Sequence, residues 1–303
     1  MKKVQVLLST YNGEKYLEEQ IKSILKQENV EISILIRDDG SKDRTIEILK
    51  ELSENYNNIA YYEGENLGPA RSFMELVDKS NKTDYYAFAD QDDIWMPKKL
   101  ISAIEKIENN SKDLETPTLY LSSLEIVDEN LNFIENKLVS GNFTFEGAMI
   151  KNFATGCTMV FNEKLCDIIR MYKPKYIIMH DSWITRVCYA IGGNVIIDEK
   201  TYIKYRQHGD NVLGYKDEGI QKLKKQFKIA FKNNVSMRVN IAKELKNGYE
   251  NLLTKNAKEV IDNLLSYQKN KKAKKYLLKN KEFRSNNKKI DLKMKLAILL
   301  NKF

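Results

Sequence analysis

Residues 85–97, YYAFADQDDIWMP, contain the pattern that decides the fold. Tyr85–Ala89 are aromatic and apolar, which is typical of a short buried strand, and the polar residues Asp90-Gln91-Asp92-Asp93 follow directly. Pro97 suits the first turn of a helix, because the N–H that proline lacks would have no partner there. The stretch therefore predicts a buried strand, a polar loop and a helix, in that order.

The same order of elements occurs twice nearer the N-terminus. Val4–Ser9 (VQVLLS) precedes Tyr11-Asn12-Gly13, and Ile32–Arg37 (ISILIR) precedes Asp38-Asp39-Gly40-Ser41. The other elements predicted in this part are helices over about 14–27, from about 43 and over about 69–79, and a strand near 59–63. Strands that alternate with helices predict an α/β fold with a mainly parallel central sheet. Because such strands end at one edge, where these sheets bind ligands, the three polar loops predict a site there.

The chain divides at about residue 218. Residues 111–218 mix strands, expected over 118–122, 157–161, 194–197 and 201–206, with helices near 162–171 and 181–191. Residues 219–303 are helical by pattern. Two apolar faces are expected there, one from Ile220, Leu223, Phe227, Ala230 and Phe231 and one from Ile241, Leu245, Tyr249 and Leu252. Lys269–Lys289 is rich in Lys and Asn, which fits either a solvated helix or a loose linker.

Charge divides at the same place. Residues 219–303 contain 23 Lys and Arg against 6 Asp and Glu, a net charge of +17, whereas residues 1–218 have a net charge of −9. The basic region fits a solvated helical face, nucleic-acid binding or attachment to an anionic membrane. We favour the membrane, because apolar residues accompany the lysines in Leu292–Phe303 (LKMKLAILLNKF). No aromatic interleaving supports nucleic-acid binding, so no nucleic-acid partner is expected.

Composition and missing motifs exclude other classes of protein. A hydrophobic fraction of 42% is too high for a disordered chain. No apolar run approaches the ~20 residues that span a bilayer, and the start MKKVQVLLST is too short for a signal peptide, so we expect a cytoplasmic protein. The three cysteines form no CxxC pair, which argues against disulfides and structural zinc. No P-loop, Gly-x-Gly-x-x-Gly or Gly-x-Ser-x-Gly motif is present.

The carboxylates expected at the sheet edge favour a divalent cation. Asp90 and Asp92 follow one strand, and Asp38 and Asp39 follow another. Like charges at one edge are unfavourable unless a cation or a basic side chain joins them. Since no set of His and Cys accompanies them, Mg²⁺ or Mn²⁺ fits better than zinc. The alternative is a solvated acidic turn that caps the next helix.

These segments, in this order, resemble the motifs of family 2 glycosyltransferases. The resemblance rests on Ser9–Gly13, Asp38–Ser41, Asn66–Arg71 (NLGPAR) and Asp90–Pro97, which span about the first 110 residues. The segments Thr155-Gly156-Cys157, His180-Asp181-Ser182-Trp183 and Tyr205-Arg206-Gln207-His208 are similar to the acceptor and base region of that family. ADQDDIW and MHDSW look like its bacterial rhamnosyltransferase branch. The resemblance implies a GT-A fold over 1–218, with a nucleotide-sugar half (1–110) and an acceptor half (111–218). The charge and the helical pattern add a basic helical region over 219–303.

The resemblance also implies roles for single residues. Those expected to bind the nucleotide sugar are Ser9, Tyr11, Asp38, Asp39, Arg71, Asp90, Arg206 and His208. Asp39 would accept a hydrogen bond from the base N3–H, which uracil and thymine have and cytosine lacks. Asp92 would hold the metal at the diphosphate. Asp181 would be the general base that deprotonates the acceptor hydroxyl, and Gly156 and Trp183 would belong to the acceptor region.

Structural roles compete with some of these assignments. Asp181 could instead be the N-cap of the helix that carries Trp183. Trp183 could pack in the core or lie beneath an acceptor sugar. Many relatives carry an acidic residue at the position of His180, so the environment of the base differs here.

The sequence thus predicts an inverting, metal-dependent glycosyltransferase at the inner face of the cell membrane. The resemblance alone implies L-rhamnose from dTDP-L-rhamnose as the donor sugar, with a UDP-hexose as the alternative, and a growing surface polysaccharide or lipid-linked glycan as the acceptor. A non-catalytic nucleotide-sugar-binding protein is an alternative of another class, which Asp90, Asp92 and Asp181 disfavour. A nucleotidyltransferase is a further one, although it would carry a Gly-rich loop after the first strand.

Overall fold

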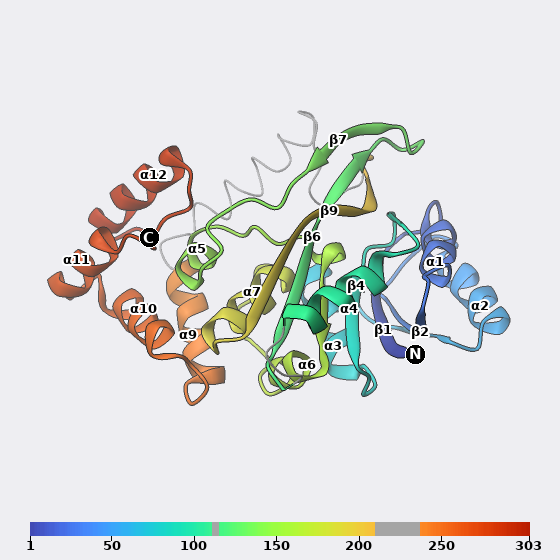
Figure 1. Ribbon diagram of the computed structural model, residues 1–303, viewed down its shortest axis with the longest axis horizontal. Coiled ribbons are helices and arrows are strands. Elements are labelled where there is room, and N and C mark those ends of the chain that lie inside the picture. The colour runs from blue at the N-terminus through green and yellow to red at the C-terminus, as the bar shows by residue number, and fades with distance from the viewer. Residues whose placement is uncertain (111–114, 210–236) are drawn as a thin grey trace.

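The computed structural model describes residues 1–110, 115–209 and 237–303 (Figure 1). The predicted boundary between residues 218 and 219 and the predicted apolar face within 220–231 lie outside these ranges. In the described residues, helices cover both faces of a mixed sheet, and a group of helices lies at one end of the molecule (Figure 1).

The sheet holds the strands in the order β3-β2-β1-β4-β8-β6-β9-β5, and β7 pairs with β6. The strands are β1 (Lys2–Thr10), β2 (Val30–Asp38), β3 (Ile59–Glu63), β4 (Tyr85–Ala89), β5 (Ile94–Trp95), β6 (Thr118–Val127), β7 (Phe133–Lys137), β8 (Val160–Asn162) and β9 (Asn194–Arg206). β1 to β4 pair in parallel, and β8 is antiparallel to both of its neighbours. This confirms the predicted α/β fold and places the carboxyl ends of β1, β2 and β4 at one edge.

The side chains of β1 point alternately to the two faces of the sheet, and this explains how the sheet packs against helices on both faces. Val4, Val6 and Leu8 belong to a buried cluster with Leu17 of α1, whereas Leu7 belongs to the cluster on the other side. Successive side chains of a strand point to opposite faces, so one strand serves two cores. The helices of this part are α1 (Leu17–Leu25), α2 (Thr45–Asn55), α3 (Pro69–Lys79), α4 (Lys99–Asn110), α5 (Phe145–Ile150), α6 (Glu163–Arg170) and α7 (His180–Ala190).

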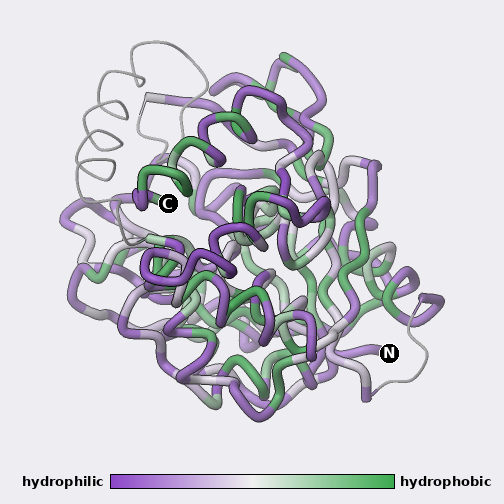
Figure 2. The backbone as a smooth tube through the Cα atoms, turned by 90° about the vertical axis from the view of Figure 1, so that its left-hand side faces the viewer, coloured by the Kyte–Doolittle hydropathy of each residue, from purple (hydrophilic) through white to green (hydrophobic). Residues whose placement is uncertain are grey.

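Four C-terminal helices lie at the end of the molecule opposite α1 and α2 (Figure 1). They are α9 (Met237–Tyr249), α10 (Lys255–Ser266), α11 (Lys271–Lys279) and α12 (Lys288–Leu299). The first two of them, α9 and α10, contact α7. The Tyr249 ring lies 6.2 Å from that of Trp183, and the Thr254 N–H donates to the Ala190 carbonyl at 2.8 Å. The tube coloured by hydropathy places hydrophobic segments inside and hydrophilic ones around them (Figure 2). No helix in the described ranges is both long and apolar enough to cross a bilayer.

Several elements differ from the sequence predictions. The two strands expected over 194–197 and 201–206 are one strand, β9, which stays paired with β6 through two register shifts. The strand expected over 157–161 is a 3₁₀ turn, Gly156–Thr158, followed by β8. Lys269–Lys289 contains α11, a helix because Ala273 and Leu277 bury one side of it. The short elements β5, β7 and α5 were not predicted, since each has too few residues to show a period.

Candidate active site

A cavity of about 710 Å³ opens at the predicted edge of the sheet. The loop after β1 and the ends of β2 and β4 form one side of it, and segments from the second half of the domain form the other. The predicted site residues on its wall are Ser9, Tyr11, Asp39, Asp90, Asp92, Gly156, Asp181 and His208. The structure therefore joins residues that lie up to 199 positions apart in the sequence into one site.

The loop after β1 is held by the DQDD segment. The side-chain oxygen of Gln91 accepts hydrogen bonds from the Thr10 hydroxyl at 2.7 Å and the Tyr11 N–H at 2.8 Å. Tyr11 is 44% exposed, so its ring lies at the rim of the cavity, whereas the Ser9 hydroxyl lies 2.5 Å from that of Ser72. Gln91 was not predicted as a site residue, although its place inside the acidic motif was a signal.

Asp39 is buried and fixed on the cavity wall. Its carboxylate accepts hydrogen bonds from the N–H groups of Leu67 and Gly68, each at 2.9 Å, and pairs with the buried guanidinium of Arg37. The Arg37 charge compensates that of Asp39 in a place with little water. Arg37 was missed in the sequence, where a charged residue at the end of an apolar strand was the available signal.

Asp38 has a different place from the one predicted. Its carboxylate accepts hydrogen bonds from the Gly40 N–H at 3.0 Å and the Ser41 N–H at 2.8 Å, and from the Ser41 hydroxyl. Gly40 has a φ of +83°, a conformation that favours glycine. Asp38 is 1% exposed, so it holds the turn that presents Asp39 and does not face the cavity.

The two arginines predicted to contact the donor lie away from the described cavity wall. Arg71 is exposed, donates to the Lys175 carbonyl at 3.2 Å and lines a smaller neighbouring cavity of about 210 Å³. Arg206 is buried, and its guanidinium donates to the Asp92 carbonyl at 2.9 Å and pairs with Glu19 at 2.5 Å. Arg206 therefore stabilises the Asp90–Asp93 loop from the side away from the cavity, where its partners compensate its buried charge.

Three carboxylates gather where the two halves meet. Burial, together with the charges of Asp92 and Asp181, raises the pKa of Asp90 to about 7. A carboxylate oxygen of Asp92 lies 2.8 Å from Nε2 of His208. Such a concentration of acidic oxygen atoms fits a divalent cation that takes oxygen ligands, because the cation would offset their mutual repulsion. Asp90, Asp92 and His208 are the residues on the wall that could hold it.

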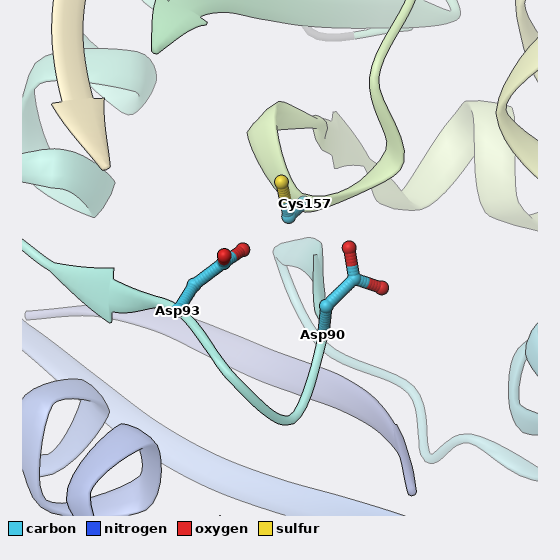
Figure 3. A group of neighbouring side chains, drawn as sticks. All are labelled: Asp90, Asp93 and Cys157. Atoms are coloured by element: carbon cyan, nitrogen blue, oxygen red, sulfur yellow. The ribbon is translucent and has the colours of Figure 1, made fainter. Parts of the chain in front are cut away.

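A second group of possible metal ligands consists of Asp90 and two fully buried residues, Asp93 and Cys157. One potential ligand atom each from Asp90, Asp93 and Cys157 lies within 4.8 Å of the others, and Figure 3 shows the three side chains converging. Burial and the neighbouring carboxylates raise the pKa of both Asp93 and the Cys157 thiol, so the thiol is protonated. A buried thiol is a poor ligand for Mg²⁺ or Mn²⁺. The carboxylates that line the cavity therefore fit the predicted cation better.

Asp181 lies at the start of α7, on the wall of the cavity. The N-cap of α7 is Met179, so Asp181 is inside the first turn and is not the cap. It accepts a hydrogen bond from Nδ2 of Asn152 at 3.2 Å. Burial raises the pKa of Asp181 to about 6, although its hydrogen bonds and the Arg186 charge oppose the shift. A carboxylate with a pKa close to neutral is suited to general-base catalysis.

The two residues predicted for the acceptor region, Gly156 and Trp183, lie in different places in the structure. Gly156 is on the cavity wall, and a Cβ added to it would lie 2.4 Å from Nε2 of His180. Trp183 is 2% exposed and packs against Tyr249 in the core. This burial leaves no ring face for a sugar, so the structure corrects the acceptor role of Trp183 to a packing role.

Comparison with known proteins identifies the family of the chain. The family described as Glycosyl transferase family 2 matches residues 5–168. The dTDP-rhamnosyl transferase RfbG of Shigella flexneri is 31% identical over 219 residues, which cover 68% of this chain and 73% of that protein.

Solved structures show the same fold. TarS 1–349 of S. aureus in complex with UDP-GlcNAc matches with a TM-score of 0.62 at 16% identity, covering 99% of this chain and 82% of that one. The complex of the same protein with UDP matches with a TM-score of 0.61 at 17% identity, covering 99% and 86%. The family match, the RfbG relative and the fold together show that this chain is a glycosyltransferase that belongs to glycosyl transferase family 2.

Proposed function

We propose that this glycosyltransferase transfers L-rhamnose from dTDP-L-rhamnose, with inversion and with the help of a divalent metal, to a surface polysaccharide or lipid-linked glycan. The observation that carries the proposal is that the residues proposed for nucleotide binding and for catalysis line one cavity. This cavity has a fixed carboxylate, Asp39, on one wall and a carboxylate with a near-neutral pKa, Asp181, on the other. Asp90 and Asp92, in the loop after β4, lie on the same wall as Asp39.

The nucleotide end would recognise the base through Asp39. Its carboxylate is already oriented by Arg37 and two backbone N–H groups, and a carboxylate oxygen has a further lone pair for the N3–H of thymine or uracil. Ser9 and Tyr11 would contact the nucleoside from the loop after β1. Preorganised polar groups bind with less loss of entropy than mobile ones.

The reaction end would carry out the displacement. Asp181 takes the proton of the acceptor hydroxyl as that oxygen forms a bond to the anomeric carbon, while the bond from this carbon to the diphosphate oxygen breaks. The electron pair leaves with the nucleoside diphosphate, and His208 lies beside Asp92 where this charge develops. A divalent cation held by Asp90 and Asp92 would supply neutralisation of the diphosphate charge. One displacement with one base inverts the anomeric centre.

The donor is supported by the name of the RfbG relative, a dTDP-rhamnosyl transferase. A UDP-hexose is the alternative, because the TarS structures of the same fold contain UDP and UDP-GlcNAc. Ligands that bind the folded state raise the melting temperature by mass action. We expect the largest rise with dTDP-L-rhamnose, and only with Mn²⁺ or Mg²⁺ present. A larger rise with UDP-glucose than with dTDP-L-rhamnose would favour the alternative, and no rise with any nucleotide would contradict the proposal.

Contact with an anionic membrane is supported by α12. Its exposed leucines recur at the spacing of one helical face, and they are Leu292, Leu296, Leu299 and Leu300, 51–65% exposed. Figure 2 shows hydrophobic turns next to the C-terminus, and lysines lie before and between the leucines of α12. Such a face can enter the headgroup region while lysines meet anionic lipids.

Sedimentation with vesicles would test this contact. We expect binding to vesicles that contain phosphatidylglycerol and weaker binding by Leu296→Ser. The control is Leu252→Ser, which changes a leucine that is 40% exposed outside α12. Equal binding by both variants and the unchanged protein would contradict a role for α12.

A further inference from the structure

His180 is a buried polar residue that the reaction described above does not use. It is the first residue of α7, directly before Asp181, and its side chain is 2% exposed. Neither ring nitrogen has a hydrogen-bond partner anywhere in the ranges that the structure describes. A buried polar atom without a partner lowers stability, because it loses its hydrogen bonds to water and gains none in return. Such a residue therefore requires an explanation.

The surroundings of His180 hold its ring firmly but satisfy neither nitrogen. The imidazole stacks on Phe73, with centroids 4.0 Å apart, and meets the edge of Phe88 at 4.9 Å. Its Nε2 approaches Gly156 so closely that any side chain there would collide with it. A phenylalanine would satisfy this aromatic environment without an unpaired polar atom. Packing alone thus does not explain a histidine.

The position of His180 indicates what it could contact. His180, Phe73 and Gly156 all line the cavity, together with Asp181. The proposed base must lie close to the carbon at which transfer occurs, and His180 precedes it on the same helix end. The nucleoside end, by contrast, is formed by the loop after β1 and by Asp39. A group that reaches His180 therefore belongs to a sugar and not to the nucleoside.

We propose that His180 is a specificity-determining residue whose uncharged imidazole forms a hydrogen bond with a hydroxyl group of the transferred sugar. This inference rests on the proposed function. An uncharged imidazole offers one N–H donor and one nitrogen acceptor, which matches the hydrogen-bonding pattern of a hydroxyl. Bound sugar would thus give a partner to an atom that has none in the described structure.

The state of the ring agrees with this role. Burial lowers the pKa of His180 to about 3, so the imidazole stays uncharged across the physiological range. A carboxylate at this position would add a further negative charge to a cavity that already contains Asp90, Asp92 and Asp181. The histidine offers the sugar a hydrogen bond without that repulsion.

The test compares nucleotide with nucleotide sugar in a binding assay, since a residue that contacts only the sugar leaves nucleotide affinity unchanged. Affinities for dTDP and dTDP-L-rhamnose, and for UDP and UDP-glucose, are measured by calorimetry with Mn²⁺ present. His180→Phe keeps an aromatic ring and removes both nitrogens, whereas His180→Gln keeps one donor and one acceptor. Trp183→Phe is the matched control, because Trp183 is equally buried on the same helix and does not line the cavity.

We expect His180→Phe to bind the preferred nucleotide sugar about 3- to 12-fold more weakly, the usual effect of one lost hydrogen bond, with unchanged affinity for the matching nucleotide. His180→Gln should recover part of that loss, and Trp183→Phe should bind both ligands like the unchanged protein. If His180→Phe weakens both ligands equally, or neither, the inference is wrong while the proposed function stands. If the unchanged protein binds no nucleotide, the proposed function fails and this inference fails with it.

Discussion

The two ends of the cavity differ in how their polar groups are paired. At the nucleotide end, Asp39 has a buried counter-charge and two backbone donors. At the proposed reaction end, Asp90 is half-buried and Asp181 is buried, and their pKa values are raised to about 7 and about 6. The ring nitrogens of His180, at the same end, have no hydrogen-bond partner in the described residues.

This difference fits the proposed roles, in which one end of the cavity binds the nucleotide and the other carries out the reaction. Groups that bind a constant part of the substrate are most effective when their surroundings fix them in advance. Groups that exchange protons or meet developing charge need pKa values close to the working pH, which burial and like charges provide at the expense of stability. Changes at the two ends should therefore have different effects, on folding at one and on turnover at the other.

The largest effect is expected at the base. Asp181→Asn should reduce turnover by ~10²–10⁴, the usual contribution of a general base, because the amide cannot take the proton of the acceptor. Affinity for dTDP should not change, since Asp181 lies at the other end. Steady-state rates and calorimetry with dTDP measure the two quantities. Loss of dTDP affinity with turnover retained would contradict the role.

The next effect concerns folding and not turnover. Arg37→Met leaves the Asp39 carboxylate buried without its counter-charge, which should lower the free energy of unfolding by about 3–5 kcal/mol. Urea denaturation measures it, and Arg44→Met is a control in an exposed ion pair with Glu47. A loss from Arg37→Met no larger than that of the control would mean that the nucleotide end is not held by this pair.

A glycine at the reaction end gives a smaller effect. Gly156→Ala would place a methyl group 2.4 Å from Nε2 of His180, and the aromatic rings around the imidazole prevent it from turning aside. We expect affinity for the preferred nucleotide sugar to fall by roughly tenfold, because the imidazole is displaced. Affinity for the matching nucleotide serves as the internal control, and an equal loss for both would place Gly156 at the nucleotide end.

The smallest effect is the twofold loss of turnover that we expect when the pH is lowered to about 6. The raised pKa of Asp181 means that the carboxylate becomes protonated, and inactive as a base, when the pH falls through about 6. Turnover at saturating donor should therefore fall to half at about pH 6 and continue to fall tenfold for each further pH unit. The residual rate of Asp181→Asn should lack this step. A midpoint of the pH profile near pH 4 would show that burial does not raise the pKa of Asp181.

Local patterns allowed much of the fold and part of the site to be predicted. The bounds of β3, α3 and β4 match the prediction, because each combines a clear period with a clear end signal. Asp39, Asp90 and Asp92 lie on one cavity, as the order of strands and loops implied, and Asp181, which only the family resemblance indicated, lies on the same cavity.

What could not be predicted depends on partners far away in the sequence. Asp38 and Asp39 are chemically identical neighbours, and only the turn decides which of them faces the cavity. Trp183 lies two residues from Asp181, yet its burial depends on Tyr249 of α9. Arg206 is close in sequence to His208, but Glu19 holds it behind the acidic loop. Contacts between distant segments leave no local pattern.

The most direct test of the account is to identify the product released from dTDP-L-rhamnose. The purified protein is incubated with this donor, Mn²⁺ and bacterial membranes as the source of acceptor, and the nucleotides are separated by chromatography. We predict that dTDP accumulates while rhamnose enters the membrane glycan, and that Asp181→Asn releases almost none. Release of pyrophosphate, or dTDP formation that Asp181→Asn leaves unchanged, would contradict transfer by a base at the reaction end of this cavity.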